Sequence, residues 1–264
     1  MLSNETGHAF RRPTLGPSPL RSAYVARECA LVRGLELHEP SRRARYGHVP
    51  GPVRGRLTRL RKRRPTNITL AVLTRPDDPR TAPLVSRLAP LFGETVVICD
   101  SERMDDPPWN GPNVRTIAHP LADDFGAQRN AAQEAATCDW VLHVDTDEDL
   151  HGLGYLSALT IMADHDGLDA IGFPRLNLVD GRASDLWPDV QYRLLHRTVR
   201  FEGRVHERPD ACRDWRRTAV ARCCTIRHHL DRARVAARSR RYDALGQHGD
   251  RHGDDAALLR PYRP

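Results

Sequence analysis

Four acidic side chains crowd the five residues Asp145-Thr146-Asp147-Glu148-Asp149. They follow an apolar run, Trp140 to Val144, which predicts a buried strand. In an extended segment Asp145 and Asp147 project to the same side, so their carboxylates can converge on one cation. Mg²⁺ and Mn²⁺ prefer oxygen ligands and bind through one or two carboxylates together with substrate phosphates. The segment therefore predicts a divalent metal site; the alternative is an acidic loop whose Asp149 caps the next helix.

The elements that would position these acids begin abruptly at Ile68. Four short apolar runs predict strands: Ile68 to Thr74, Thr95 to Cys99, Val114 to Ala118 and Trp140 to Val144. Helices are predicted after Asp78-Pro79, as cap and first-turn proline, and from an Asp124 cap through Thr137. This alternation predicts an α/β fold built from right-handed βαβ units, with a mostly parallel sheet flanked by helices.

Ligands of open parallel sheets bind beyond the carboxyl ends of the strands. Thr74, Asp100 and Asp145 fall at three such ends. We therefore expect these three polar residues to face one binding site.

Composition narrows the class of protein. The chain has 264 residues, of which 39% are hydrophobic, enough for one large α/β domain or two small ones. No apolar run approaches the ~20 residues needed to cross a bilayer, and the N-terminus lacks the pattern of a secretory signal. These features predict a cytoplasmic protein.

The net positive charge of the chain comes from its first 65 residues. Residues 1–65 hold 15 Arg and Lys against 4 acids, whereas the remaining residues hold 26 against 30. We predict a basic, disordered leader over 1–65, a catalytic domain over 66–247 and a polar tail over 248–264. Contact between the leader and anionic lipid, at the inner face of the membrane, is the functional alternative, and no specific nucleic-acid partner is expected.

The six cysteines form no CxxC pair and no regular disulfide framework, which is typical of reduced thiols. A zinc site is the minor alternative, because six potential ligands crowd one region: His206, Cys212, Cys223, Cys224, His228 and His229.

Four ordered motifs resemble a known family. They are the stretches Asp124 to Ala132, Asp139 to Glu148, Trp187 to Leu195 and Phe201 to Glu207. Together they are similar to family 2 glycosyltransferases with the GT-A fold, and most to the bacterial branch that includes lipopolysaccharide-core glucosyltransferase-like proteins. The resemblance covers roughly residues 67–245.

The resemblance implies a nucleotide-sugar donor, a divalent metal and inversion at the anomeric carbon. Thr74 and Asp100 match positions that hold the nucleoside, and Asp145 and Asp147 match the DxD motif that meets ribose and metal-bound diphosphate. A cation there would stabilise the charge that the nucleoside diphosphate gains as it leaves. The implied acceptor is a hydroxyl of a cell-envelope glycan, a glycolipid or a related molecule, and one sugar is transferred.

The acceptor hydroxyl must also lose a proton, and a positioned carboxylate can take it. Glu207 is the first candidate for this base and Asp189 the second, with a solvated salt bridge as the bland alternative for either. His206 and His228 would complete the metal shell, and a histidine ligand would favour Mn²⁺ over Mg²⁺.

Two other functions compete with the glycosyltransferase. One is a noncatalytic GT-A-like protein that binds a nucleotide and docks through its basic leader. The other is a metal-dependent hydrolase or nucleotidyltransferase, which also uses clustered acids but leaves the motif Arg204 to Glu207 unexplained.

Overall fold

A computed structural model gives the fold of this chain over residues 62–109, 111–186, 189–204, 207–233, 235 and 258–261, and the backbone of two short strands before them. These strands, β1 (Leu35–His38) and β2 (Arg56–Arg59), pair with each other antiparallel. Most of the predicted leader and most of the predicted tail lie outside the described residues, so the domain boundaries stay predictions. No helix in the described part is long and apolar enough to cross a membrane.

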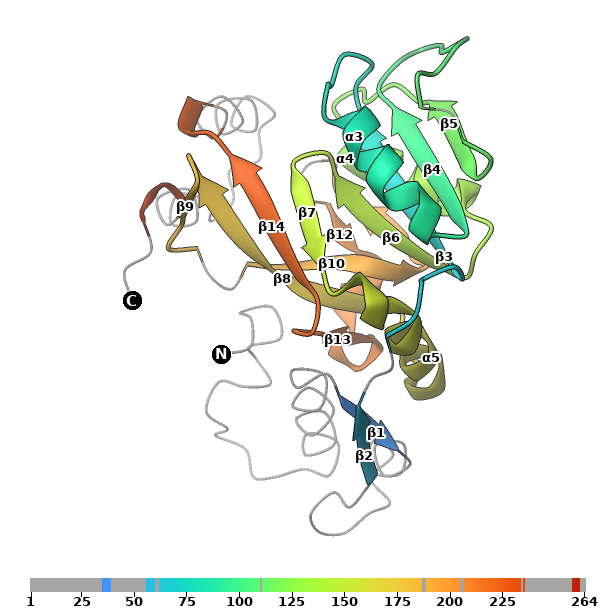
Figure 1. Cartoon of the computed structure of the whole chain (residues 1–264), viewed down its shortest axis with the longest axis vertical. Helices are drawn as coiled ribbons and strands as arrows, with labels where there is room; N and C mark the ends of the chain where they lie inside the picture. The colour runs from blue at the N-terminus through green and yellow to red at the C-terminus, as the bar shows by residue number, and fades with distance from the viewer. Residues whose placement is uncertain are drawn as a thin grey trace.

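A ten-stranded sheet organises the domain, in the order β5-β4-β3-β6-β10-β8-β14-β7 with β9 and β13 beside β8 (Figure 1). Its first half is parallel and comprises β3 (Ile68–Thr74), β4 (Glu94–Cys99), β5 (Val114–Ala118) and β6 (Trp140–Asp145). These are the four strands that the apolar runs predict. The predicted α/β fold, with a mostly parallel sheet flanked by helices, is confirmed.

The second half of the sheet is mixed. Its strands are β7 (Glu148–His151), β8 (Ala170–Val179), β9 (Arg182–Ala183), β10 (Asp189–His196), β13 (Thr218–Val220) and β14 (Thr225–Leu230). Strand β10 joins the halves, because it pairs antiparallel with both β6 and β8. Strand β14 runs parallel to β8 and antiparallel to β7. A small separate pair, β11 (Phe201–Glu202) and β12 (Arg208–Pro209), follows β10 along the chain.

Different helices cover the two faces of the parallel half. Leu70 and Val72 of β3 share one core with α3 (Thr81–Leu88) and α5 (Leu156–Asp166). Ala71, between them, belongs to the opposite core with Ala132 of α4 (Phe125–Ala135). Leu70 and Val72 are fully buried, and burial of such side chains contributes about 1.5–3 kcal/mol each. Short 3₁₀ turns complete the fold: η2 (Ala89–Leu91), η3 (Leu153–Tyr155), η4 (Asp210–Arg213) and η5 (Trp215–Arg217).

Helix starts were harder to predict than strands. Asp124 caps α4 as expected, because its carboxylate accepts the backbone N–H of Ala127 at 2.8 Å. The prediction for Asp78-Pro79 is wrong: α3 begins at Thr81, and the Asp78 carboxylate binds the Arg80 guanidinium instead. The same carboxylate also accepts the backbone N–H of Arg80 at 3.0 Å, so it holds the residue that precedes α3 rather than the first turn of the helix.

Residues at the end of the predicted leader contact the domain. Arg63 donates its backbone N–H to the carbonyl of Gly154 at 2.7 Å, and Ser157 donates its hydroxyl to the carbonyl of Arg64 at 3.2 Å. The folded unit therefore begins a few residues before position 66.

Candidate functional site

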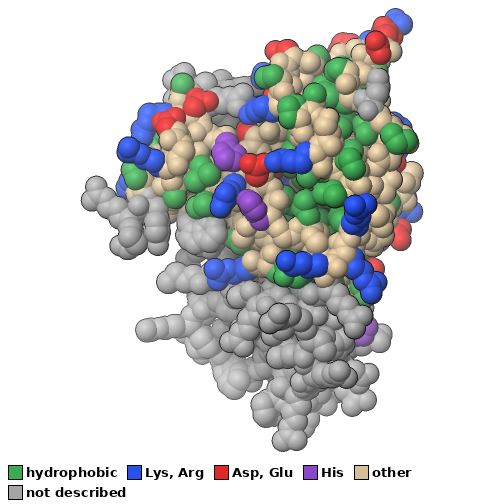
Figure 2. Space-filling model, viewed as in Figure 1, with side chains coloured by type: hydrophobic (Ala, Val, Ile, Leu, Met, Phe, Trp, Pro, Cys, Tyr) green, Lys and Arg blue, Asp and Glu red, His purple; other side chains and the backbone are tan. Residues whose placement is uncertain are grey.

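The acidic segment links the two halves of the sheet. Asp145 is the last residue of β6, Thr146 and Asp147 form a two-residue turn, and Glu148 begins β7. The carbonyl of Asp147 accepts the backbone N–H of His229 at 2.8 Å, which fixes the turn against β14. The alternative in which Asp149 caps a helix is wrong, because Asp149 lies within β7 and its carboxylate pairs with Arg87 at 2.7 Å. In Figure 2, acidic, basic and histidine side chains gather near the middle of the face shown.

Asp145 is neutralised by two buried arginines. Its carboxylate accepts hydrogen bonds from Arg129 at 3.1 and 3.2 Å and from Arg193 at 2.6 Å. Burial acts to raise the pKa of Asp145, but the charges of Arg129 and Arg193 outweigh it and hold this pKa far below its usual range. A cation at Asp145 would share this carboxylate with two guanidinium groups.

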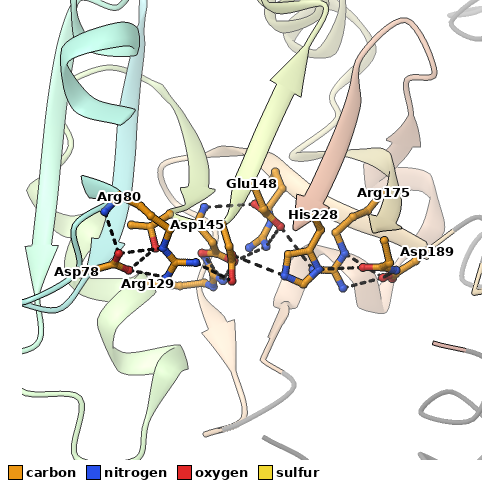
Figure 3. Close-up of polar contacts among 12 residues, drawn as sticks. Asp78, Arg80, Arg129, Asp145, Glu148, Arg175, Asp189 and His228 are labelled. Carbon is orange, nitrogen blue, oxygen red and sulfur yellow. Dashed lines mark hydrogen bonds and ion pairs between the residues drawn. The ribbon is translucent and has the colours of Figure 1, made fainter. Parts of the chain in front are cut away.

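Acidic and basic side chains alternate along the site beyond Asp145 (Figure 3). Arg193 reaches the fully buried Glu148 at 2.7 Å, and Arg175 approaches Glu148 at 3.4 Å and Asp189 at 2.6 Å. The crowded acids of the motif thus receive positive charge from β8, β10 and α4.

Asp147 differs from its neighbours. Its carboxylate oxygens lie 3.6 Å from Nε2 of His228 and 3.7 Å from Nη1 of Arg80, both longer than hydrogen bonds. His228 is buried on β14, and its Nδ1 lies 2.8 Å from Oδ1 of Asn177. One carboxylate and one imidazole therefore face each other across a gap that no direct hydrogen bond fills.

The predicted metal ligands fit a cation only in part. Asp147 and His228 converge, Asp145 is occupied by arginines, and His206 lies outside the described residues. No three Asp, Glu, His or Cys side chains of the described ranges lie close enough together to hold a metal ion, which also gives the zinc alternative no support there. A carboxylate and an imidazole suit a cation such as Mn²⁺ whose other ligands come from substrate phosphates.

Arg80 is held beside Asp147 by Asp78. Asp78 accepts Nε and Nη2 of Arg80 at 2.9 and 2.6 Å and the hydroxyl of Thr146 at 2.7 Å. This contact ties the loop after β3 to the turn after β6. It also leaves Nη1 of Arg80 directed to the Asp147 side of the site.

The two candidate bases sit in different surroundings. Glu207 accepts Nε of Arg129 through Oε1 at 2.6 Å, and within the described part of the chain its Oε2 has no hydrogen-bond donor. Asp189 accepts Arg175 and Asn177 through Oδ2 and Gln191 through Oδ1. Burial acts to raise the pKa of Asp189, but Arg175 and these hydrogen bonds outweigh it and lower this pKa. A carboxylate bonded at both oxygens is a poor proton acceptor.

Close packing brings Glu207 to α4. A Cβ on Gly126 would lie 2.4 Å from the carbonyl oxygen of Gly203, so only glycine allows this approach. Phe125 donates its backbone N–H to the carbonyl of Arg204 at 2.8 Å. These contacts hold Gly203 and Arg204 against α4, the helix that carries Arg129.

Thr74 and Asp100, which are predicted to bind the nucleoside, lie at the ends of neighbouring strands. The Asp100 backbone N–H donates to the carbonyl of Thr74 at 2.8 Å, and its carboxylate accepts the N–H of Leu121 at 2.8 Å. The Thr74 hydroxyl makes a short hydrogen bond with that of Thr81. Both side chains thus shape the loops at this edge of the sheet.

Sequence reasoning gave no role at this site to five residues: Arg80, Arg129, Arg175, Asn177 and Arg193. A signal existed for three of them. Arg129 lies three positions before Ala132, on the side of α4 that packs on the sheet. Arg175 and Asn177 alternate along a strand whose other residues are mainly apolar. Buried charges are paired and buried amides are hydrogen-bonded, so each arginine implies a buried acid and Asn177 implies a polar partner.

No protein-family model and no curated protein matches this sequence. Solved structures of S. aureus TarS resemble part of it. TarS 1-349 covers 62% of this chain at 14% identity and a TM-score of 0.36, and the same protein in complex with UDP-GlcNAc covers 42% at 20% identity and a TM-score of 0.29. This chain spans 60% and 34% of those two chains and 22% of the longer TarS structure. The functional proposal therefore rests on the geometry of the site.

Proposed function

We propose that this chain is an inverting glycosyltransferase of the GT-A type, family 2-like, which moves one sugar from a nucleotide-sugar donor to an acceptor hydroxyl. The observation that carries the proposal is that Asp147, in the turn after β6, faces His228 on β14, with Arg80 on one side. Such a cluster suits the diphosphate of a nucleotide sugar, which carries its negative charge next to the bond that breaks.

Asp147 and His228 are the residues that would hold a divalent cation, Mn²⁺ or Mg²⁺, and the cation would stabilise negative charge on the leaving diphosphate. Arg80 would donate to a phosphate oxygen through Nη1, because Asp78 already orients its guanidinium. Thr74 and Asp100 form the proposed nucleoside edge with Asp145, whose side chain is 28% exposed and so open to a ribose hydroxyl.

Glu207 is the proposed base. It would accept the proton of the acceptor hydroxyl while that oxygen forms a bond to the anomeric carbon and the bond to the diphosphate breaks, which inverts the configuration. Arg129 holds Oε1, so Oε2 is the oxygen that would take the proton. The proposed acceptor is a hydroxyl of a cell-envelope glycan or a glycolipid, which the basic leader would approach at an anionic membrane surface.

The test is a panel of nucleotide sugars, each added with Mn²⁺ to the full chain. A donor that binds the native state should raise the melting temperature. It should also release its nucleoside diphosphate slowly to water and faster with an acceptor. Binding without any release would favour the noncatalytic nucleotide-binding protein, and the absence of binding across the panel would refute both functions.

A further inference from the structure

A buried amide connects Asp189 to His228. Nδ2 of Asn177 lies 2.9 Å from Oδ2 of Asp189, and Oδ1 of Asn177 lies 2.8 Å from Nδ1 of His228. Asn177 is 1% exposed and His228 is 3% exposed. Figure 3 shows His228 between the acids of the β6 turn and the Asp189–Arg175 pair.

The chemistry of these groups fixes the direction of each hydrogen bond. Asp189 is ion-paired with Arg175, so it is a carboxylate that can only accept. Asn177 must therefore direct its NH₂ group at Asp189 and its carbonyl oxygen at His228. A carbonyl oxygen can only accept, so the proton lies on Nδ1 of His228.

The other ring nitrogen, Nε2, faces Asp147 and lies 3.6 Å from its Oδ1, which is longer than a hydrogen bond. Metal-binding histidines commonly donate their second ring N–H to a carbonyl or carboxylate, which fixes both the tautomer and the ring.

We propose that Asp189 and Asn177 are positioning residues that hold His228 in its Nδ1–H tautomer, so that Nε2 and Asp147 are presented together as ligands for a divalent cation. This proposal rests on the proposed function for the cation's role, but the tautomer does not depend on catalysis. It also gives Asp189 a task other than that of the base. Gln191 and Arg175 fix the Asp189 carboxylate in turn.

The tautomer can be read directly by long-range ¹H–¹⁵N NMR of the full chain at about pH 8, where an ordinary histidine is neutral. His228→Gln assigns the resonance. We expect Nδ1 protonated and Nε2 bare in the parent, and loss of that preference in Asn177→Leu. A parent His228 that is protonated on Nε2 overturns the proposal without need of any variant.

Cation binding is the second measurement, with Mn²⁺ alone as the probe and free Mn²⁺ read by EPR. The parent should bind Mn²⁺ through a site that His228→Gln removes, and Asn177→Leu should weaken it roughly 10- to 100-fold. Asp189→Asn changes the other positioning residue and is used if Asn177→Leu fails to fold. It is also expected to weaken Mn²⁺ binding. His229→Gln is the matched control, because His229 is half exposed and contacts Asp149 instead.

Equal Mn²⁺ affinity in the parent and in a folded Asn177→Leu or Asp189→Asn variant would overturn the proposal. The absence of a His228-dependent Mn²⁺ site in the parent would also overturn it. Failure of the proposed function looks different. The tautomer and the Mn²⁺ site would then persist, while no nucleotide sugar binds.

Discussion

Arg193 is the residue whose loss should destabilise the fold most among the charges of the site. Its Nη2 lies 2.6 Å from Asp145 and 2.7 Å from Glu148, and its side chain is 6% exposed. In Arg193→Met, Asp145 keeps Arg129, whereas Glu148 keeps Arg175 at 3.4 Å and the backbone N–H of Asp145 at 3.2 Å. Glu148 is fully buried, and removing one partner of a buried ion pair typically costs about 3–5 kcal/mol.

Urea unfolding of the parent and Arg193→Met measures this cost. A loss of about 3–5 kcal/mol is expected, which lowers the melting temperature by roughly 6–20 °C for a domain of this size. Adding Glu148→Gln to Arg193→Met should recover part of the loss, because the unpaired buried charge is then gone. Arg87→Met is the control: Arg87 pairs with Asp149 at the surface, so less than about 1 kcal/mol should change. A loss below about 1 kcal/mol in Arg193→Met would refute the view that arginines neutralise the motif.

Three further predictions concern single side chains. Glu207→Gln should keep donor affinity and lower turnover by roughly 10²- to 10⁴-fold, as steady-state kinetics and donor titration will show; a variant with parental turnover would exclude Glu207 as the base. Arg80→Met should weaken nucleotide-sugar binding roughly 10- to 100-fold by calorimetry, whereas Arg75→Met, exposed on the same loop, should not; equal affinities would remove Arg80 from the diphosphate site. Burial acts to raise the pKa of Glu94, but hydrogen bonds from Thr137 and Thr69 and the charge of Arg115 lower it. The ionised Glu94 carboxylate therefore stabilises the folded state above the ordinary pKa of 4.5, and this stabilisation is lost as the pH falls through the lowered pKa. Glu94→Gln should cost about 1–3 kcal/mol at neutral pH and progressively less in acid, and a cost that is constant across urea unfolding at several pH values would contradict this assignment.

The parallel half of the sheet could be predicted because its signals are local. Strand β3 is an uninterrupted apolar, β-branched run, and α4 starts at an aspartate that caps it. The start of α3 could not be predicted in the same way, because the Asp78 carboxylate holds Arg80 rather than the first turn of the helix. Strand β7, which begins at Glu148, could not be predicted either. It pairs with β14, about eighty residues further along the chain, and its acidic sequence gives no local sign of that partner.

The same division applies to the site. The DxD spacing and the later histidines pointed to Asp147 and His228, which the fold brings together. The role of Asp145 could not be separated from that of Asp147 by spacing alone, because the difference comes from Arg129 and Arg193 on distant elements. Whether a carboxylate meets an arginine or a metal is decided by tertiary structure.

The central claim is that Asp147, within the motif, serves the donor diphosphate. The most direct measurement compares release of nucleoside diphosphate from the nucleotide sugar that binds the parent, for the parent, Asp147→Asn and Asp149→Asn, with Mn²⁺ and with a chelator. Asp149 is the matched acid, two residues on and paired with Arg87 at the surface. We expect Mn²⁺-dependent release that Asp149→Asn retains and a folded Asp147→Asn lacks. Equal release by the parent and Asp147→Asn, with and without the chelator, would contradict it.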